Sequence, residues 1–340
     1  MNGLFYAESV IRPFPLVIGH RGAPGYRPEH TRSSYELAIA MGVDAVEPDV
    51  VPTKDGVLVV RHENEISGTT DIADRPEFAD RRRSAVVDGE ELTGWFTEDL
   101  TWAELATLRC RERLPALRPG SAAFDGTEPI LRLSDLLALV RAASAESGRE
   151  VGVVLEIKHA TTFAAAGFDL AALVVRELRD AGWDDGLLPL WIESFEAEVL
   201  DRLRAPLAEA GIAARLVYLV EAEGSPYDLV ARLGEAAPTY AQGISPAGLD
   251  ALRGRVDGIS VDKRILLRRP GLVAEAADRG LLTFTWTCRP ENAFLDPVYR
   301  RPGGEEAFGD YAAEWALLAA TGVHGVFVDH ADRGVAAFRR

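Results

Sequence analysis

The sequence predicts an α/β protein built as a TIM (β/α)8 barrel with a small inserted lobe. Short β-rich apolar runs alternate with longer amphipathic runs, and strand followed by helix is typical of a parallel sheet. Eight such units favour closure into a barrel over an open sheet. One long stretch breaks this rhythm, which predicts an insertion at 63–128 within a single domain spanning 1–340.

The strand candidates are short runs rich in valine, leucine and isoleucine, bounded by glycine, proline or charged residues. Each is of the length that one barrel strand requires. They lie at 15–20, 43–51, 151–158, 187–195, 215–220, 256–262, 281–287 and 324–329.

The helical candidates show apolar residues at helical spacing, and several end at a glycine. Thr31 and Ser134 are predicted N-caps, because their hydroxyl groups can accept from the first free amides of a helix. The candidates lie at 31–42, 134–147, 169–182, 196–211, 270–280 and 311–322.

The predicted insertion follows the second strand. It holds an acidic and arginine-rich segment, a short helical pattern at 101–110, and glycine- and proline-rich material up to Gly126. An insertion after a barrel strand lies at the carboxyl ends of the strands, where barrel enzymes place their active sites.

The composition excludes several classes of partner. Among 340 residues, 37 Lys and Arg against 53 Asp and Glu give a formal charge of −16. No basic patch is available to neutralise phosphates, so we expect no nucleic acid partner and no docking on an anionic membrane. No apolar run is long enough to span a bilayer, which predicts no stable membrane insertion. The sequence does not determine the oligomeric state.

Two observations favour a cytoplasmic location. The two cysteines, Cys110 and Cys288, are far apart and lack metal-ligand spacing, so we expect neither a disulfide framework nor a zinc site. Residues 1–14 lack both a basic region and an apolar core, which predicts no signal peptide, although a trimmed secreted chain would look the same.

Charged residues collect where the early strands end. Glu47 and Asp49 flank Pro48 and therefore share one side of the second strand. Glu156 and Lys158 repeat this arrangement at the end of the third strand. Burying a carboxylate costs free energy unless an opposite charge compensates it, so we expect a cationic group or a cation beside these residues.

Further titratable residues converge on the same end of the barrel. The first strand delivers His20 and Arg21, and His62 ends the next apolar run after the second strand. Each residue alone is better explained as structural, but their convergence on one barrel mouth indicates an active site. Three carboxylates without sulfur select one divalent hard cation, Mg²⁺ or Ca²⁺, over zinc.

These residues also carry a family resemblance. The segments "HRGAPGYRPEHT" (20–31), "GVDAVEPDVVPTKDGVLVVRHE" (42–63) and "LEIK" (155–158) resemble the glycerophosphodiester phosphodiesterase family. The match continues through "SFE" (194–196) and "TWTCRPENAF" (285–294), and "GTTDIADRPEFADRR" (68–82) is similar to the insertion of the longer members. The resemblance implies a TIM barrel that hydrolyses glycerophosphodiesters to glycerol 3-phosphate and an alcohol.

The resemblance also implies roles for individual residues. By motif position, His20 and His62 would be the acid–base pair, and Arg21 and Lys158 would contact the phosphate. The divalent metal would be bound by Glu47, Asp49 and Glu156.

The sequence departs from the family at one position. Where the family motif reads PENT, this sequence has His30 in place of the asparagine. Trp286, at the end of the seventh strand, is expected to line the pocket against the glycerol or the head group. His159 is expected to be exposed beside the end of the third strand and not to be catalytic, and His324 and His330, which flank the last strand, are expected to be structural.

The mechanism leaves two choices open. We expect His62 to protonate the leaving oxygen and His20 to act as the base, but the reverse assignment fits equally. The nucleophile is either water or the substrate's own glycerol hydroxyl, which would give a cyclic phosphate.

Two other functions compete with this one. A related barrel phosphodiesterase would act on lysophospholipids, but the charged insertion does not suggest an apolar entry surface. A catalytically silent barrel would bind glycerophosphodiesters without cleaving them. The presence of every expected ligand and both histidines favours the enzyme.

Overall fold

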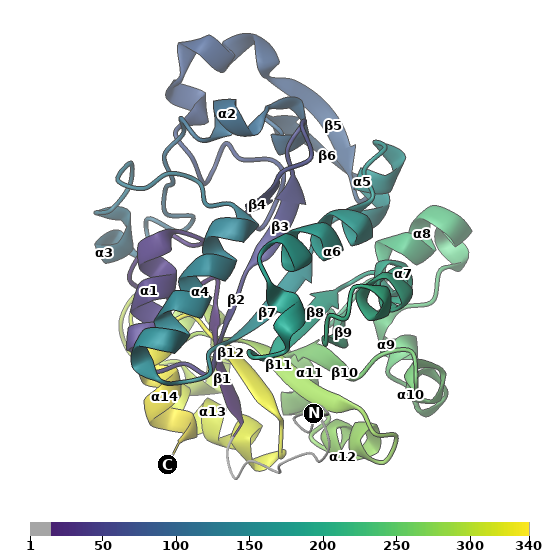
Figure 1. Ribbon diagram of the computed structural model, residues 1–340. Coiled ribbons are helices and arrows are strands. Elements are labelled where there is room, and N and C mark those ends of the chain that lie inside the picture. Colours follow the sequence, from purple (N-terminus) through teal and green to yellow (C-terminus); the bar gives the residue numbers. More distant parts are fainter. Residues whose placement is uncertain (1–14, 340) are drawn as a thin grey trace.

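The computed structural model describes residues 15–339 and shows a closed barrel of parallel strands surrounded by helices (Figure 1). β1 pairs with β12 on one side and with β2 on the other, and a β2–β7 pairing closes the ring. The predicted TIM barrel is therefore confirmed. The barrel strands are β1 (Leu16–His20), β2 (Ala45–Glu47), β3 (Asp49–Pro52), β7 (Gly152–Ile157), β8 (Leu190–Ser194), β9 (Arg215–Val220), β10 (Gly258–Asp262), β11 (Leu282–Cys288) and β12 (Gly325–Val328).

The second barrel strand is divided at Pro48, so the predicted strand at 43–51 is two strands in the structure. Pro48 has no N–H to give to a ladder, and the break falls at this residue. β2 completes the ring, whereas β3 pairs with β7 and then with the antiparallel strand β4 (Leu58–Val60). The β3–β4 hairpin therefore returns the chain toward the site after β3 has left the ring.

Helices surround the barrel and follow most strands, as Figure 1 shows. Thr31 caps the first helix as predicted, since its side chain accepts from the Ser34 amide. The prediction for Ser134 was wrong, because the N-cap is Arg132, two residues earlier, and the helix begins at Leu133. The barrel helices are α1 (Arg32–Ala40), α4 (Leu133–Ser147), α5 (Ala160–Ala165), α6 (Leu170–Asp180), α7 (Ala197–Glu209), α8 (Tyr227–Leu233), α9 (Tyr240–Gly243), α10 (Pro246–Leu252), α11 (Lys263–Arg268), α12 (Leu272–Ala277), α13 (Tyr311–Ala320) and α14 (Ala331–Phe338).

The chain between β4 and α4 adds no strand to the barrel. It forms the hairpin β5 (Arg83–Val87) and β6 (Glu90–Gly94) and the single-turn helices α2 (Trp102–Leu105) and α3 (Pro119–Ala122). The helical pattern predicted at 101–110 is therefore shorter than expected. The limits 63–128 for the insertion stay a prediction.

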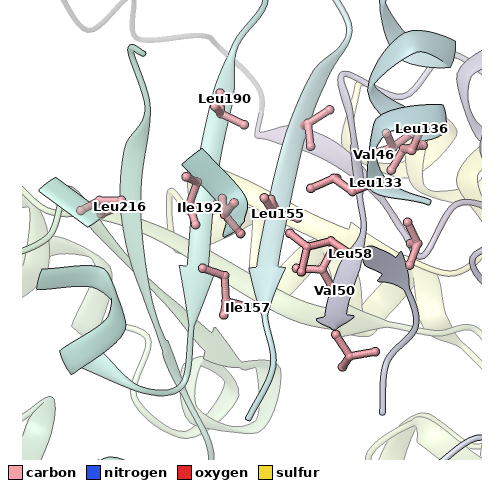
Figure 2. Packing of buried hydrophobic residues seen from close by; sticks show 14 of the residues in the cluster. Val46, Val50, Leu58, Leu133, Leu136, Leu155, Ile157, Leu190, Ile192 and Leu216 are labelled. Carbon is pink, nitrogen blue, oxygen red and sulfur yellow. The ribbon is translucent and has the colours of Figure 1, made fainter. Parts of the chain in front are cut away.

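Two apolar layers hold the barrel together. The outer layer lies between the strands and the helices, where Val46 and Val50 pack near Leu133 and Leu136 of α4 (Figure 2). The inner layer fills the barrel with side chains from the opposite face of the same strands. The inner residues are Ile18, Ala45, Val154, Trp191, Val217, Phe284 and Phe327.

The inner layer positions the site. Because side chains alternate along a strand, the residue two places after an inner-layer residue also points into the barrel. Apart from Leu219 after Val217, these next positions carry polar or aromatic side chains at the carboxyl ends of the strands. They include His20, Glu47, Glu156, Glu193, Trp286 and Asp329.

Three remaining expectations concern the chain as a whole. Cys110 and Cys288 are buried and free. Within residues 15–339, every helix is too short or too polar to cross a bilayer. The segment from which we predicted no signal peptide, 1–14, lies outside the described residues.

Candidate active site

Three carboxylates lie together at the carboxyl ends of neighbouring strands. Glu47, Asp49 and Glu156 are buried, and each offers an oxygen within 4.8 Å of the others. The strand register explains this cluster, since Asp49 lies opposite Glu156 and Glu47 lies opposite His20. The sequence predicted this grouping, and the structure brings the three residues together.

Lys158 lies against two of these carboxylates. Its Nζ is 3.2 Å from Asp49 Oδ1 and 2.6 Å from Glu156 Oε1. Burial alone would raise the pKa of Asp49, but Lys158 and His30 outweigh burial and hold that pKa well below its usual range. Asp49 is therefore the carboxylate that stays ionised most readily.

The other carboxyl groups show the opposite shift. Burial, followed by the charge of Asp49, raises the pKa of Glu47 well above its usual range. Burial and Asp49 also raise the pKa of Glu156 to about 8, against the opposing effect of Lys158. The site thus holds more carboxyl groups than nearby cations can compensate.

The donor set fits a divalent hard cation. It consists of carboxylate oxygens without sulfur, which is the ligand type that Mg²⁺ and Ca²⁺ prefer. Asp49 Oδ1 and Glu156 Oε1 accept no aligned hydrogen bond from residues 15–339, although Lys158 approaches both at ion-pair distance. Two buried oxygens thus keep acceptor capacity on the side where the cluster converges.

Arg21 lies beside the cluster. Its backbone N donates to Glu47 Oε2 at 2.8 Å, and its Nε lies 3.4 Å from Asp49 Oδ2. Its Nη1 donates to Glu29 Oε2 at 3.1 Å. These contacts hold the guanidinium at the mouth of the site, where it can bind an anion.

His30, the departure from the family motif, is fully buried and contacts a proposed metal ligand. Its Nε2 lies 2.9 Å from Asp49 Oδ2, and its Nδ1 lies 2.7 Å from the Tyr35 hydroxyl. Its backbone φ of 60° is left-handed, a region in which asparagine and histidine are both enriched. Histidine therefore fits the turn and supplies a hydrogen bond to Asp49.

Each candidate catalytic histidine has a carboxylate on Nδ1. His20 Nδ1 lies 2.7 Å from Asp329 Oδ1, and His62 Nδ1 lies 2.7 Å from Glu63 Oε2. An ionised carboxylate favours the tautomer with the proton on Nδ1, which leaves Nε2 free to accept a proton.

Burial and nearby cations disfavour the charged form of both rings, which lowers the pKa of each. Burial, with Arg21 adding to it, lowers the pKa of His20 to about 4. Burial also lowers the pKa of His62 well below its usual range, and Arg21 and Lys158 act in the same direction. A bound anion would offset the two cations and raise both pKa values.

His62 reaches the site by a route that the sequence did not reveal. It follows β4, which runs antiparallel to β3, and the Arg61 amide donates to the Asp49 carbonyl at 3.0 Å. The hairpin therefore brings His62 back beside the cluster. The sequence placed His62 at the right end of the barrel but not on the return strand.

A cavity of about 630 Å³ opens at this end of the barrel. Trp286 lines it, with Nε1 donating to the Ser260 carbonyl at 3.2 Å, and packs edge-to-face on Phe195. Among the predicted site residues, those that line the cavity are His20, Arg21, Glu47, His62, Glu156, Lys158 and Trp286.

The sequence reasoning missed several residues of this site. Glu193 is a fourth buried carboxyl group, and its pKa is raised well above the usual range by burial and by Glu156. Its inward position at the end of the fourth strand was the available signal. Phe195 shares that signal, and Asp329 occupies the equivalent place after the eighth strand.

The three histidines that were not expected to be catalytic lie outside the cavity lining, and the His159 side chain is half-buried. His159 Nδ1 contacts Asp88 of the β5–β6 turn at 2.6 Å. His324 Nδ1 accepts from the Thr283 amide. His330 packs edge-to-face on Tyr26.

The closed barrel and the charged cavity at its carboxyl end define a TIM-barrel enzyme. The model of the glycerophosphoryl diester phosphodiesterase family matches residues 20–333. The chain belongs to this family, and it is a hydrolase of the phosphodiesterase class.

Relatives and solved structures agree with this assignment. A glycerophosphodiester phosphodiesterase of Arabidopsis thaliana is 31% identical over 93% of this chain and 83% of its own length. One from Haemophilus influenzae is 26% identical over 97% of this chain and 91% of its own.

Two solved structures share the fold. An Oleispira antarctica phosphodiesterase in complex with the product sn-glycerol-3-phosphate has a TM-score of 0.62 and 20% identity, covering 95% of this chain and 96% of its own. A glycerophosphodiester phosphodiesterase of Agrobacterium tumefaciens has a TM-score of 0.57 and 20% identity, covering 95% and 99%.

Proposed function

We propose that this protein hydrolyses glycerophosphodiesters to glycerol 3-phosphate and an alcohol, with a divalent hard cation bound by Glu47, Asp49 and Glu156. One observation carries the proposal: the buried carboxylate cluster borders the same cavity as His20 and His62. The product complex of the Oleispira antarctica phosphodiesterase supports the choice of substrate class.

Cationic side chains bind the phosphodiester group in this scheme. Arg21 offers a planar fork of donors, and Lys158 offers a point charge beside the carboxylates. When bound, the divalent cation supplies Lewis-acid stabilisation of the phosphoryl charge. The two side chains orient the anion and offset the negative charge that grows during cleavage.

The histidines transfer the proton that cleavage requires. Once the bound anion has offset the nearby cations, His62 in its doubly protonated form gives its Nε2 proton to the leaving oxygen as the bond from that oxygen to phosphorus breaks. His20, in its neutral form, takes a proton from the attacking oxygen on its own Nε2. The exchange of these two roles satisfies the same geometry, because both rings present Nε2. The attacking oxygen belongs to water or to the substrate's glycerol hydroxyl.

The aromatic wall binds the organic part of the substrate. Trp286 and Phe195 lie with ring centroids 5.6 Å apart, and Lys158 Nζ is 5.6 Å from the Phe195 ring. The wall is therefore next to the proposed phosphate site. It offers apolar contact to the glycerol or to the head group.

The test is release of glycerol 3-phosphate from glycerophosphocholine, glycerophosphoethanolamine and glycerophosphoglycerol. The protein is stripped with EDTA and then assayed with Mg²⁺, Ca²⁺ or Mn²⁺ restored. Activity that disappears with EDTA and returns with one metal is the expected result. Glu47→Gln should abolish it, whereas Glu36→Gln, an exposed carboxylate on α1, should not.

Silence with all three substrates and every metal would contradict the proposal. Lysophospholipids would then be assayed, followed by stoichiometric binding of glycerophosphocholine without product formation. Either result would replace the proposed function with one of the two alternatives raised by the sequence.

A further inference from the structure

The two histidines of the site share a second feature. Each Nδ1 contacts a carboxylate, and each of those carboxylates contacts an arginine from one short stretch, residues 111–118. This stretch, called the arginine segment below, lies in the chain between β4 and α4 and not in the barrel itself.

On the side of His62, the arginine is Arg113. Its Nη2 donates to Glu63 Oε1 at 2.7 Å, while the other Glu63 oxygen contacts His62. The Arg113 guanidinium also binds Glu29 through both of its oxygens, at 2.9 Å and 2.5 Å. Glu29 in turn accepts from Arg21, so one chain of ion pairs connects His62 to the proposed phosphate site.

On the side of His20, the arginine is Arg118. Its Nη2 donates to Asp329 Oδ2 at 2.6 Å, while Asp329 Oδ1 contacts His20. Its Nε donates to Glu291 Oε1 at 2.8 Å. Arg118, Asp329 and Glu291 are all buried, so these charge-assisted bonds are shielded from water.

The arginine segment is itself anchored by backbone bonds. The Arg111 amide donates to the Thr69 carbonyl at 2.9 Å, and the Glu112 amide donates to Asp125 Oδ1 at 2.6 Å. Glu112 is buried and accepts from the Leu114 amide and the Ser121 hydroxyl. The backbone between the two arginines therefore has a defined place over the site.

We propose that Arg113 and Arg118 are positioning residues that hold the Glu63 and Asp329 carboxylates in place. Through these carboxylates they keep the rings of His62 and His20 oriented with the proton on Nδ1. The proposal rests on the proposed function and adds a role for the chain inserted after β4. A guanidinium that bridges two carboxylates fixes both in place, and a carboxylate on Nδ1 fixes the orientation of an imidazole.

The charge state of the two carboxylates is consistent with this role. Burial alone would raise the pKa of Asp329, but Arg289 and Arg118 outweigh it and hold that pKa well below its usual range. Burial opposes the shift at Glu63 too, yet His62 and Arg113 lower its pKa to about 2. Both groups stay ionised and can only accept, so the proton stays on Nδ1.

The first experiment compares Arg113→Gln and Arg118→Gln with Arg111→Gln. Arg111 is a matched control in the same segment, because its guanidinium is exposed and pairs with Asp74 at the surface. The first two variants are expected to lose about 10–100-fold in kcat with little change in KM. Arg111→Gln is expected to match the wild type, and two losses no larger than that of the control would overturn the proposal.

A second readout separates positioning from loss of structure. A 4-nitrophenyl ester of glycerol phosphate has a leaving group that needs little protonation, unlike glycerophosphocholine. The variant that misplaces the acid should lose much less activity on the aryl ester than on the natural diester. Arg113→Gln should show this split if His62 is the acid, and Arg118→Gln should show it if the roles are reversed. Equal losses on both substrates for both variants would contradict the proposal.

Fallback variants cover a failure to fold. Arg118→Gln leaves the buried carboxylates of Asp329 and Glu291 without this arginine, whereas Asp329→Asn removes the carboxylate that contacts His20 with little change in volume. Glu63→Gln does so for His62, and the double variant Glu63→Gln/Arg113→Gln should be no worse than Glu63→Gln alone. Additive losses in this cycle would show that Arg113 does not act through Glu63.

A third readout is independent of activity. Nitrogen-15 chemical shifts of the histidine rings report the tautomer of each ring in the metal-free protein. His20 and His62 are expected to carry the proton on Nδ1 in the wild type, and His62 should become a tautomer mixture in Arg113→Gln. An inactive wild type would refute the proposed function alone, whereas unchanged tautomers in the variants would refute the positioning role alone.

Discussion

The barrel interior has two halves that are built from the same strands but have opposite character. The lower half is the apolar inner layer, and the upper half is the site at the carboxyl ends of the strands. The inner-layer residues of the lower half are apolar, and after five of them the residue two places further along the chain belongs to the site. The pairs are Ile18 and His20, Val154 and Glu156, Trp191 and Glu193, Phe284 and Trp286, and Phe327 and Asp329. Strand alternation decides which side chains point inward, whereas depth along the strand decides their chemistry.

The comparison shows which half stabilises the fold. The lower half removes apolar surface from water and packs tightly, as in the edge-to-face contact of Trp191 with Phe284. The upper half places carboxyl groups such as Glu47 and Glu193 out of water beside one another, which raises their pKa values. Such an arrangement opposes folding and is explained by the chemistry of the site.

The largest expected effect is on activity, from the upper half. Glu156→Gln should lower kcat/KM by about 10³-fold, because the cation would lose one of its three ligands. The free energy of unfolding without metal should change little, since burial and the charge of Asp49 raise the pKa of Glu156 and its ionised form therefore contributes little to stability. Assays with Mg²⁺ and urea unfolding with EDTA test both statements, and full activity would remove Glu156 from the ligand set.

The opposite result, a loss of stability without a loss of activity, is expected for a substitution of Phe284 in the lower half. Phe284→Ala should lower the free energy of unfolding by about 3–5 kcal/mol, because it opens a cavity in the lower half. The folded fraction should keep the kcat of the wild type. The exposed Leu317→Ala is the control and should change stability by less than about 0.5 kcal/mol. A stable but inactive Phe284→Ala variant would break the division between the two halves.

A pH dependence is expected at the rim of the upper half. The pKa of Glu63 is lowered to about 2 in the folded protein, against about 4.5 when unfolded, so its ion pair stabilises the fold above pH 4.5. Glu63→Gln should therefore lose about 1–3 kcal/mol at pH 7. Urea unfolding should show this deficit shrinking as the pH falls below 4.5 toward 2. A deficit in unfolding free energy that grows as the pH falls would contradict the lowered pKa of Glu63.

The smallest effect is expected directly beneath His20. Ile18→Val removes one methyl group from the lower half and should lower the free energy of unfolding by about 1 kcal/mol. Thermal or urea unfolding measures this change. The kcat should stay within twofold of the wild type, and a larger fall would mean that packing below the site controls the position of His20.

The sequence predicted the barrel because its signals are local and repeated. Valine-rich runs, amphipathic helices and helix ends at glycine each depend on a few neighbouring residues, and the eight strand predictions all correspond to barrel strands. The helix start at Leu133 was missed, because Arg132 at the N-cap gives no capping signal. The division of the second strand at Pro48 was only partly visible, since proline marks a break but not the pairing on each side.

The site was predictable where it follows from strand alternation and not where it depends on pairing. Glu47, Asp49, Glu156 and Lys158 could be grouped because their spacing puts them on one face at strand ends. Asp329 escaped notice, because its contact with His20 joins residues 309 positions apart. The carboxylate–arginine contacts were likewise invisible in a charge-rich segment that reads as a solvated surface.

The sequence by itself determined the fold class, the family, and the residue types gathered at the barrel mouth. These depend on periodicity and on short motifs, which are properties of neighbouring residues. Only the tertiary structure decided which carboxylate meets which histidine, and that the stretch 111–118 lies over both. Ion pairs between distant segments depend on where the folded chain places their ends, and periodicity carries no information about that placement.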